Sequence, residues 1–194
     1  MHKGRLEAFS DGVIAILITI MVLELKVPHG ADIADLQPLI PVFISYILSF
    51  IYLGIYWNNH HHMLQVASHV NGATLWANSH LLFWLSLVPF ATAWMGEHKF
   101  APWPVLLYGA VLFMCGCAYT ILAQTLVKLH GRESTLATAM GRDVKGIASI
   151  VIYAIAIGLA FVNPLISYGC YVLVAMLWLL PDKRVERALK KSGL

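Results

Sequence analysis

Residues 5–25 read RLEAFSDGVIAILITIMVLEL, a polar opening followed by a long apolar run. A helix needs about 20 mainly apolar residues to cross the hydrocarbon core of a bilayer, and residues 9–25 approach that length. A secretory signal peptide is not indicated, because the run carries Asp11 and Glu24 and no small-residue cleavage pattern follows Lys26. The stretch therefore predicts a first transmembrane span.

The rest of the chain has the same apolar character. Of its 194 residues, 59% are hydrophobic and only 12% are charged, whereas soluble proteins average about 45 to 50% and about 25%. Because backbone polar groups in lipid must bond within their own segment, these stretches predict helices. We expect an all-α membrane protein with six transmembrane helices in one domain, residues 1–181, and a short basic tail, residues 182–194. The six predicted spans cover residues 9–25, 39–57, 75–95, 104–127, 144–161 and 164–180.

The distribution of basic residues predicts the orientation. In a six-span chain the N-terminus, the second and fourth loops and the C-terminus share one side of the membrane. That side holds eleven of the thirteen Lys and Arg residues, and the other side holds only Lys26 and Lys99. Cytoplasmic loops are enriched in Lys and Arg, so both termini should be cytoplasmic. The basic tail either lies at the anionic inner leaflet or is a solvated segment that sets the topology.

Polar side chains from the first three spans should meet in the cytoplasmic leaflet. An ionisable residue inside a span is costly without a partner, so Asp11 calls for one, unless it caps the first helix or lies at headgroup level. Polar groups within lipid are expected to bond one another across helices. The candidates for this inner-leaflet network are Arg5, Ser10, Asp11, Trp57, Asn59, His60, His61, Asn78 and His80.

Neither a metal site nor a disulfide framework is expected. The consecutive residues His60, His61 and His62 do not share one helical face, and no cysteine lies at ligand spacing from them. Cys115 and Cys117 form a Cys-x-Cys pair inside an apolar stretch, which fits neither zinc spacing nor a disulfide pattern. We therefore expect no cofactor and no bound metal.

The opening motif resembles the signature of a known channel family. The pattern Arg-x-x-x-Phe-Ser-Asp, formed by Arg5, Phe9, Ser10 and Asp11, is similar to that of the endosomal and lysosomal potassium channel family, transmembrane protein 175. The segments Tyr-Trp-x-Asn-His-His at 56–61 and Pro-Phe-x-Thr-x-x-x-Gly-Glu at 89–97 also look like family patterns. The resemblance implies a prokaryotic, inner-membrane member whose six-helix subunits form a homotetramer, with the bilayer and copies of the chain as partners and no nucleic acid.

The first span carries a narrow aliphatic stripe. At about 100 degrees per residue, Ile20 and Leu23 lie within about 40 degrees of Ile16, and Thr19 borders them. Asp11 lies about 140 degrees from Ile16, so it should face the subunit's own helices. By itself such a stripe fits lipid contact or ordinary packing. The resemblance implies that the first helix lines a central pore, with Ile16, Ile20 and Leu23 forming the constriction beside Thr19.

The expected function is a potassium-selective or potassium-preferring cation channel, with potassium as the permeant ion. The sequence has no Thr-Val-Gly-Tyr-Gly-like loop and no periodic arginine series, so neither a carbonyl filter nor a voltage sensor is expected. The alternative is a small secondary transporter or proton-permeable pathway that uses the His and Asp side chains of the inner leaflet. An enzyme is not expected, because no Ser/His/Asp order, His-Glu-x-x-His motif or phosphate-binding loop is present.

Overall fold

The computed structural model describes residues 3–131, 133–140 and 143–179, and these contain eight α-helices, one 3-10 helix and no strand. The predicted tail, residues 182–194, lies outside the described residues. In chain order the elements are α1 (Gly4–Leu23), η1 (Ile33–Leu39), α2 (Ile40–Val66), α3 (Gly72–Ser86), α4 (Val88–Glu97), α5 (Pro102–His130), α6 (Thr135–Met140), α7 (Val144–Leu159) and α8 (Pro164–Leu179).

The third predicted span, residues 75–95, is divided into two helices. α3 ends at Ser86 and α4 begins at Val88, with Leu87 between them. The cause is Pro89, which has no N–H to donate within the first turn of α4. A side-chain cap starts α3, because the Asn71 carboxamide accepts the N–H of Thr74 at 2.9 Å. The prediction of one continuous helix over this stretch was therefore wrong.

The second helix is longer than the predicted span 39–57. α2 continues to Val66, so the three consecutive histidines lie inside it and not beyond its end. No glycine or proline interrupts residues 57–66, and polar side chains at a helix surface leave the backbone hydrogen bonds intact. The helix stops at Ala67, whose backbone is extended with ψ of 135°.

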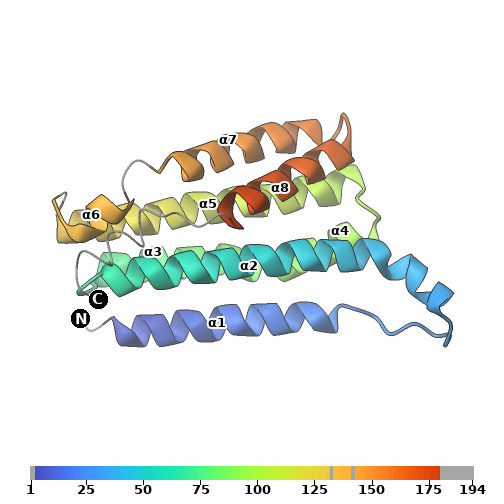
Figure 1. Ribbon diagram of the computed structural model, residues 1–194, viewed down its shortest axis with the longest axis horizontal. Coiled ribbons are helices and arrows are strands. Elements are labelled where there is room, and N and C mark those ends of the chain that lie inside the picture. Colours follow the sequence, from blue (N-terminus) through green and yellow to red (C-terminus); the bar gives the residue numbers. More distant parts are fainter. Residues whose placement is uncertain (1–2, 132, 141–142, 180–194) are drawn as a thin grey trace.

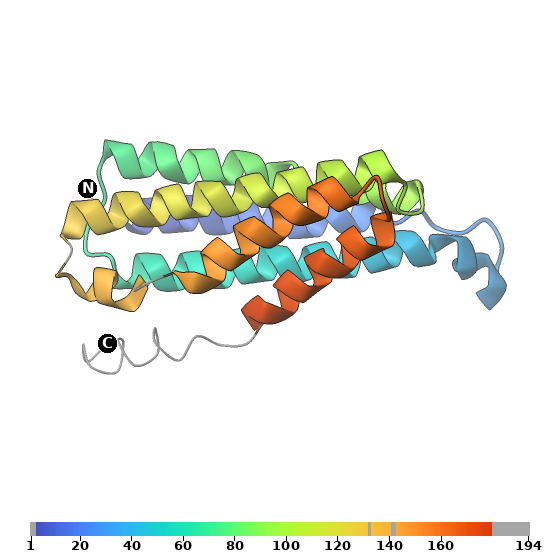
Figure 2. The same cartoon turned by 90° about the horizontal axis from the view of Figure 1, so that it is seen from above.

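The helices form a bundle with α1 at one edge and the α7–α8 pair at the opposite edge (Figure 1). α1 packs against α2, α3 and α4, whereas α5 packs against α3, α4, α7 and α8. α7 and α8 reverse direction around Asn163, and both run obliquely to the long axis of the bundle (Figure 2). The α1 surface that faces away from the bundle is therefore left without a neighbour among the described helices.

Close contacts join the inner helices. A Cβ added at Gly96 of α4 would lie 2.8 Å from the Cα of Val42 in α2, so only glycine permits this approach. Nearby, the Ser49 hydroxyl bonds to Thr92 at 2.7 Å and to Tyr108 at 2.9 Å, which joins α2 to α4 and α5. Without water to compete, such packing and hydroxyl contacts hold membrane helices together.

The lengths and compositions of the helices fit a membrane protein. Three described segments are long and apolar enough to cross a bilayer, namely Gly4–Leu23, Ile33–Val66 and Pro102–His130, and two shorter apolar helices form the α7–α8 pair. Many large apolar side chains on the outer surface are exposed, including Trp76 at 80%. An outer surface of this kind requires lipid or another apolar partner.

Candidate pore surface and the polar network behind it

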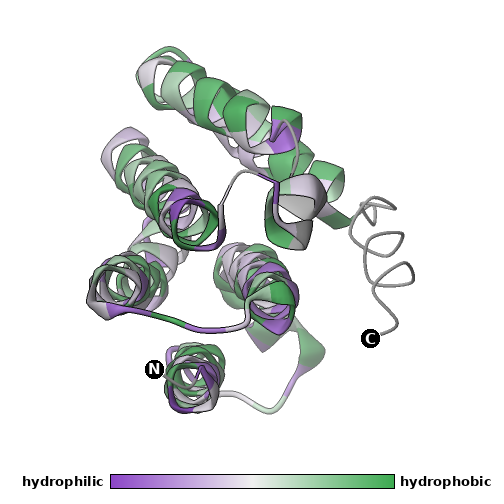
Figure 3. Ribbon diagram, turned by 90° about the vertical axis from the view of Figure 1, so that its left-hand side faces the viewer, coloured by the Kyte–Doolittle hydropathy of each residue, from purple (hydrophilic) through white to green (hydrophobic). Residues whose placement is uncertain are grey.

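α1 has one buried face and one uncovered face. The buried side chains are Leu6, Ser10, Ile14, Leu17 and Met21, spaced three or four residues apart. On the opposite side Ile16 is 57% exposed, Ile20 40% and Leu23 78%. Viewed along the bundle, α1 lies at its edge (Figure 3). The predicted aliphatic stripe therefore points away from the other described helices along the C-terminal part of α1.

Two further predicted residues share this uncovered surface. The Thr19 hydroxyl is exposed and donates to the carbonyl oxygen of Ile16 at 2.9 Å, so its lone pairs face outward. Phe9 is 60% exposed, one heptad before Ile16. The Phe9 ring therefore lies on the aliphatic side of α1 and not among the polar groups behind it.

A buried polar chain connects three helices behind this surface. The Asn78 carboxamide of α3 donates to the Ser10 hydroxyl at 2.9 Å, and its oxygen is 2.7 Å from Nε2 of His60 in α2. Ser10 in turn donates to the carbonyl oxygen of Leu6 at 2.8 Å. All three side chains of this chain are buried. Because each finds a partner inside the subunit, the chain fixes the rotation of α1 relative to α2 and α3.

A second polar contact lies nearer the surface. The indole Nε1 of Trp57 donates to the Asp11 carboxylate at 3.0 Å, and the His61 ring stacks on the Trp57 ring with 5.9 Å between centroids. Asp11 therefore contacts α2 on the flank of α1, away from the Ile16 stripe.

The remaining predicted network residues lie elsewhere. Arg5 is exposed at the start of α1. Asn59 donates to the carbonyl oxygen of Ile55 in its own helix and faces α5. His80 accepts the indole N–H of Trp84 one turn further along α3, at 2.9 Å. The nine predicted residues are thus divided between one buried chain, one half-exposed contact and three separate positions.

Two contacts that the sequence did not indicate hold the ends of α1. The Lys3 ammonium donates to the carbonyl oxygens of Leu64 and Gln65 at 2.7 and 2.9 Å, at the C-terminus of α2. A cation there satisfies carbonyls that lack a helical partner. Beyond the other end of α1, exposed Lys26 forms an ion pair with Glu97 of α4. Both pairs are too far apart in sequence for any local spacing to indicate them.

Replacing Asp11 by Ala should lower stability by about 1 kcal/mol, because the Trp57 N–H loses its acceptor near the protein surface. The matched variant Trp57→Phe removes the same hydrogen bond from the other partner. Thermal unfolding of both single variants and the double variant measures the coupling. We expect the double variant to lose less than the sum of the two single losses. Purely additive losses would show that the two side chains do not interact.

No three His, Cys, Asp or Glu side chains gather at ligand distance within the described part of the chain. The chemistry that this site offers is therefore an uncharged aliphatic surface with one hydroxyl, supported from behind by neutral hydrogen bonds and one carboxylate.

Residues 5–89 match the family model described as endosomal/lysosomal potassium channel TMEM175. A potassium channel of Chryseobacterium sp. (strain P1-3) is 56% identical over 192 residues, which cover 99% of this chain and 100% of that one. The chain belongs to the TMEM175 family. It is accordingly a multi-pass membrane protein of a channel family.

Two other TMEM175 relatives extend the comparison. The crystal structure of a lysosomal potassium-selective channel TMEM175 homolog from Chamaesiphon minutus matches with a TM-score of 0.80 and 27% identity, covering 92% of this chain and 96% of that one. The human endosomal/lysosomal proton channel TMEM175 is 36% identical over 86 residues, which cover 38% of this chain and 16% of the human protein. The names of TMEM175 relatives thus include both potassium and proton channels.

Proposed function

We propose that this protein is a potassium-preferring cation channel whose pore is lined by the uncovered face of α1 in a homotetramer. The observation that carries the proposal is the aliphatic surface of Ile16, Ile20 and Leu23, exposed at 57%, 40% and 78% on a helix whose other face is packed. Four such faces around one axis would cover one another and leave a narrow channel between them.

Selectivity in this pore arises from hydration. An aliphatic ring gives a cation no ligand, so an ion that enters it must keep or lose part of its water shell. Potassium is larger and holds its water less tightly than sodium, so it loses less on entry. The Thr19 hydroxyl, whose lone pairs face outward between the rings, offers one compensating contact.

The buried chain of Ser10, Asn78 and His60 serves the pore by orientation. A rotation of α1 by one residue, about 100 degrees, would turn the aliphatic stripe away from the axis and break these hydrogen bonds. The hydrogen bond between Trp57 and Asp11, on the flank of α1, opposes the same rotation of the helix. These residues are positioning groups, and none of them lines the proposed pore.

We further propose six membrane crossings, made by α1, α2, α3 with α4, α5, α7 and α8, with both termini in the cytoplasm of a prokaryotic cell. The support is the eleven-to-two distribution of Lys and Arg between the two sides. A reporter enzyme fused after Leu194 should be active only in its cytoplasmic form. Activity of a periplasmic reporter at that position would contradict the topology.

The second candidate function is a proton-permeable pathway. It is favoured by the proton-channel name of the human relative and by three histidines, His60, His61 and His62, on one turn of α2. A secondary transporter that uses the same groups would give slow, saturable flux coupled to a substrate.

Recording from the purified protein in a planar bilayer distinguishes these functions. We expect discrete single-channel openings, a reversal potential near the potassium equilibrium value under mixed potassium and sodium gradients, and little change when a proton gradient is imposed. A reversal potential that follows the proton gradient would favour the proton pathway. Saturable flux without single-channel openings would favour a transporter and contradict the channel.

A further inference from the structure

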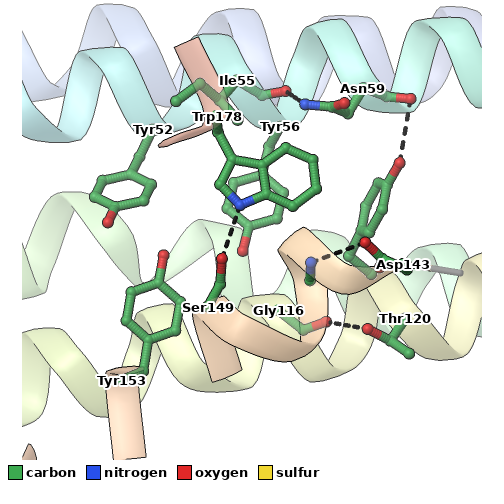
Figure 4. Close-up of a pocket in the computed structure, with 12 residues that line it drawn as sticks. Tyr52, Ile55, Tyr56, Asn59, Gly116, Thr120, Asp143, Ser149, Tyr153 and Trp178 are labelled. Carbon is green, nitrogen blue, oxygen red and sulfur yellow. Dashed lines mark hydrogen bonds between the residues drawn. The ribbon is translucent and has the colours of Figure 1, made fainter. Parts of the chain in front are cut away.

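A cavity of about 40 Å³ lies inside the subunit between α2, α5, α7 and α8, apart from the uncovered face of α1 (Figure 4). Its walls are mainly aromatic. Part of the space exists because residue 116 is a glycine, whose added Cβ would lie 3.6 Å from the Ile150 side chain and 4.0 Å from the Tyr56 hydroxyl. The aromatic lining residues are Tyr52, Tyr56, Tyr119, Tyr153 and Trp178.

Most polar groups around this cavity already have partners. The Ser149 hydroxyl accepts the indole N–H of Trp178 at 2.9 Å and donates to a backbone carbonyl of its own helix. The Thr120 hydroxyl donates to the carbonyl oxygen of Gly116 at 2.9 Å. The Tyr119 hydroxyl lies 3.4 Å from the carbonyl oxygen of Asn59.

The hydroxyl of Tyr56 is different. It extends from α2 into this space, and no residue in the described part of the chain forms a hydrogen bond with it. The Tyr56 side chain is half-buried, and its hydroxyl keeps its hydrogen-bonding capacity free at the cavity wall. A bound water or a bound ligand with an N–H or O–H donor would use that capacity.

Among the described lining residues, Asp143 is charged. The Asp143 carboxylate lines the cavity while accepting the N–H of Gly146 at 2.8 Å at the start of α7. A carboxylate beside aromatic rings suits a cation, because the faces of tyrosine and tryptophan rings attract positive charge. An ammonium group also has three donors, which match the Tyr56 oxygen and the carboxylate. Water would satisfy the hydroxyl but would gain nothing from the ring faces.

The volume limits the size of the group. A cavity needs about 10 to 15 Å³ for one water, so 40 Å³ holds about three atoms of this size. This is the size of an ammonium with one or two carbons. We propose that the cavity binds the primary ammonium end of an alkylamine, either a free small amine or the headgroup of an aminophospholipid. The proposal does not depend on the pore, because none of the lining residues lies on α1.

Binding of a free amine is tested with ethylammonium on the purified full chain by saturation-transfer NMR, with ethanol as the neutral molecule of the same size. We expect transfer to ethylammonium and not to ethanol. The variant Asp143→Asn keeps an oxygen for the N–H of Gly146 and removes the charge, so affinity should fall about tenfold. Tyr56→Phe should also weaken binding, and Glu97→Gln, a distant carboxylate, should leave it unchanged.

The lipid source is tested in nanodiscs that contain equal amounts of phosphatidylethanolamine and phosphatidylglycerol. Native mass spectrometry should show preferential retention of phosphatidylethanolamine, and Asp143→Asn should abolish the preference. Ethylammonium binding without lipid preference would assign the site to free amines, and lipid preference would assign it to the headgroup. Absence of both, or binding that neither Asp143→Asn nor Tyr56→Phe weakens, would show that no amine occupies this cavity and would overturn the proposal.

Discussion

Replacing Ile16 by Asn is expected to raise cation current about tenfold and to lower the preference for potassium over sodium. Ile16 lies in the middle of the uncovered face of α1, 57% exposed in the isolated subunit. In the proposed pore its side chain forms an aliphatic ring that excludes water and obliges ions to shed part of their hydration. A carboxamide admits water and offers ligands. A barrier lowered by about 1.4 kcal/mol corresponds to the tenfold increase.

The chain offers a matched control for this experiment. Ile155 of α7 is also 57% exposed but lies at the edge of the bundle opposite α1 (Figure 1). The variant Ile155→Asn carries the same chemical change to a surface that faces lipid, so its current and selectivity should equal those of the unchanged protein. Reversal potentials under mixed potassium and sodium gradients measure both variants. Ile18 of α1 is half-buried against the core, so it is a poorer control.

Ile20→Asn and Leu23→Asn extend the experiment along the stripe. If all three variants assemble and conduct as the unchanged protein does, then α1 does not line the pore and another helix face must do so.

The variant Gly96→Leu is expected to lose most of its folded, assembled form. A Cβ at this position would lie 2.8 Å from the Cα of Val42 and 3.3 Å from the Ser45 hydroxyl oxygen, so even the first carbon of a side chain requires α2 and α4 to separate. Overpacking of a core typically costs about 1 to 3 kcal/mol, and a leucine against a backbone should reach the upper end or exceed it. Separation of these helices would also break the bond between Ser49 and Thr92.

Gly169→Leu is the matched control for that variant. Gly169 lies on α8, where no other heavy atom comes within 4 Å of the added Cβ. Thermal melting at one fixed scan rate and the yield of intact oligomer should separate the two variants clearly. If the Gly96→Leu protein melts at the same temperature as the Gly169→Leu protein, the close contact between α2 and α4 contributes little to stability.

The sequence predicted which side of α1 carries the aliphatic stripe because that helix is regular and is interrupted by no proline. Residues 10, 14, 17 and 21 lie on one side by periodicity alone, and these are the buried positions. The division of the third stretch was missed, although Pro89 is visible in the sequence, because an unbroken apolar run conceals a change of helix. Hydropathy marks membrane segments and is insensitive to a local break in the hydrogen-bond ladder.

The polar network shows that the depth of a residue in the membrane does not determine which neighbouring helix its side chain faces. Asn78 and His80 lie at the same depth, but a separation of two residues turns them about 200 degrees apart, so only one of them can face α1. The structure gives that place to Asn78, which meets Ser10 and His60. The same argument, applied to adjacent residues about 100 degrees apart, separates Asn59 from His60.

Tertiary contacts between distant residues could not be predicted from one sequence. The hydrogen bond between Lys3 and the end of α2 joins residues more than 60 positions apart in the chain. The aromatic cavity is lined by residues of four helices. Neither has a local spacing or a motif. Both depend on how the helices pack, which is decided by side-chain volumes such as the missing side chains at Gly96 and Gly116.

The shortness of α7 has a consequence for the surrounding lipid. Its 16 residues measure about 24 Å along the axis, whereas the hydrocarbon layer of a bilayer is about 30 Å thick. α2, with 27 residues, is long enough to cross that layer with turns to spare. Thinning of the bilayer beside α7 would remove this mismatch, at a cost of fractions of a kcal/mol for each ångström. Each subunit would then gather lipids with shorter acyl chains along its outer edge, and membrane thickness would act on the α7 side of the protein more strongly than on the side formed by α1.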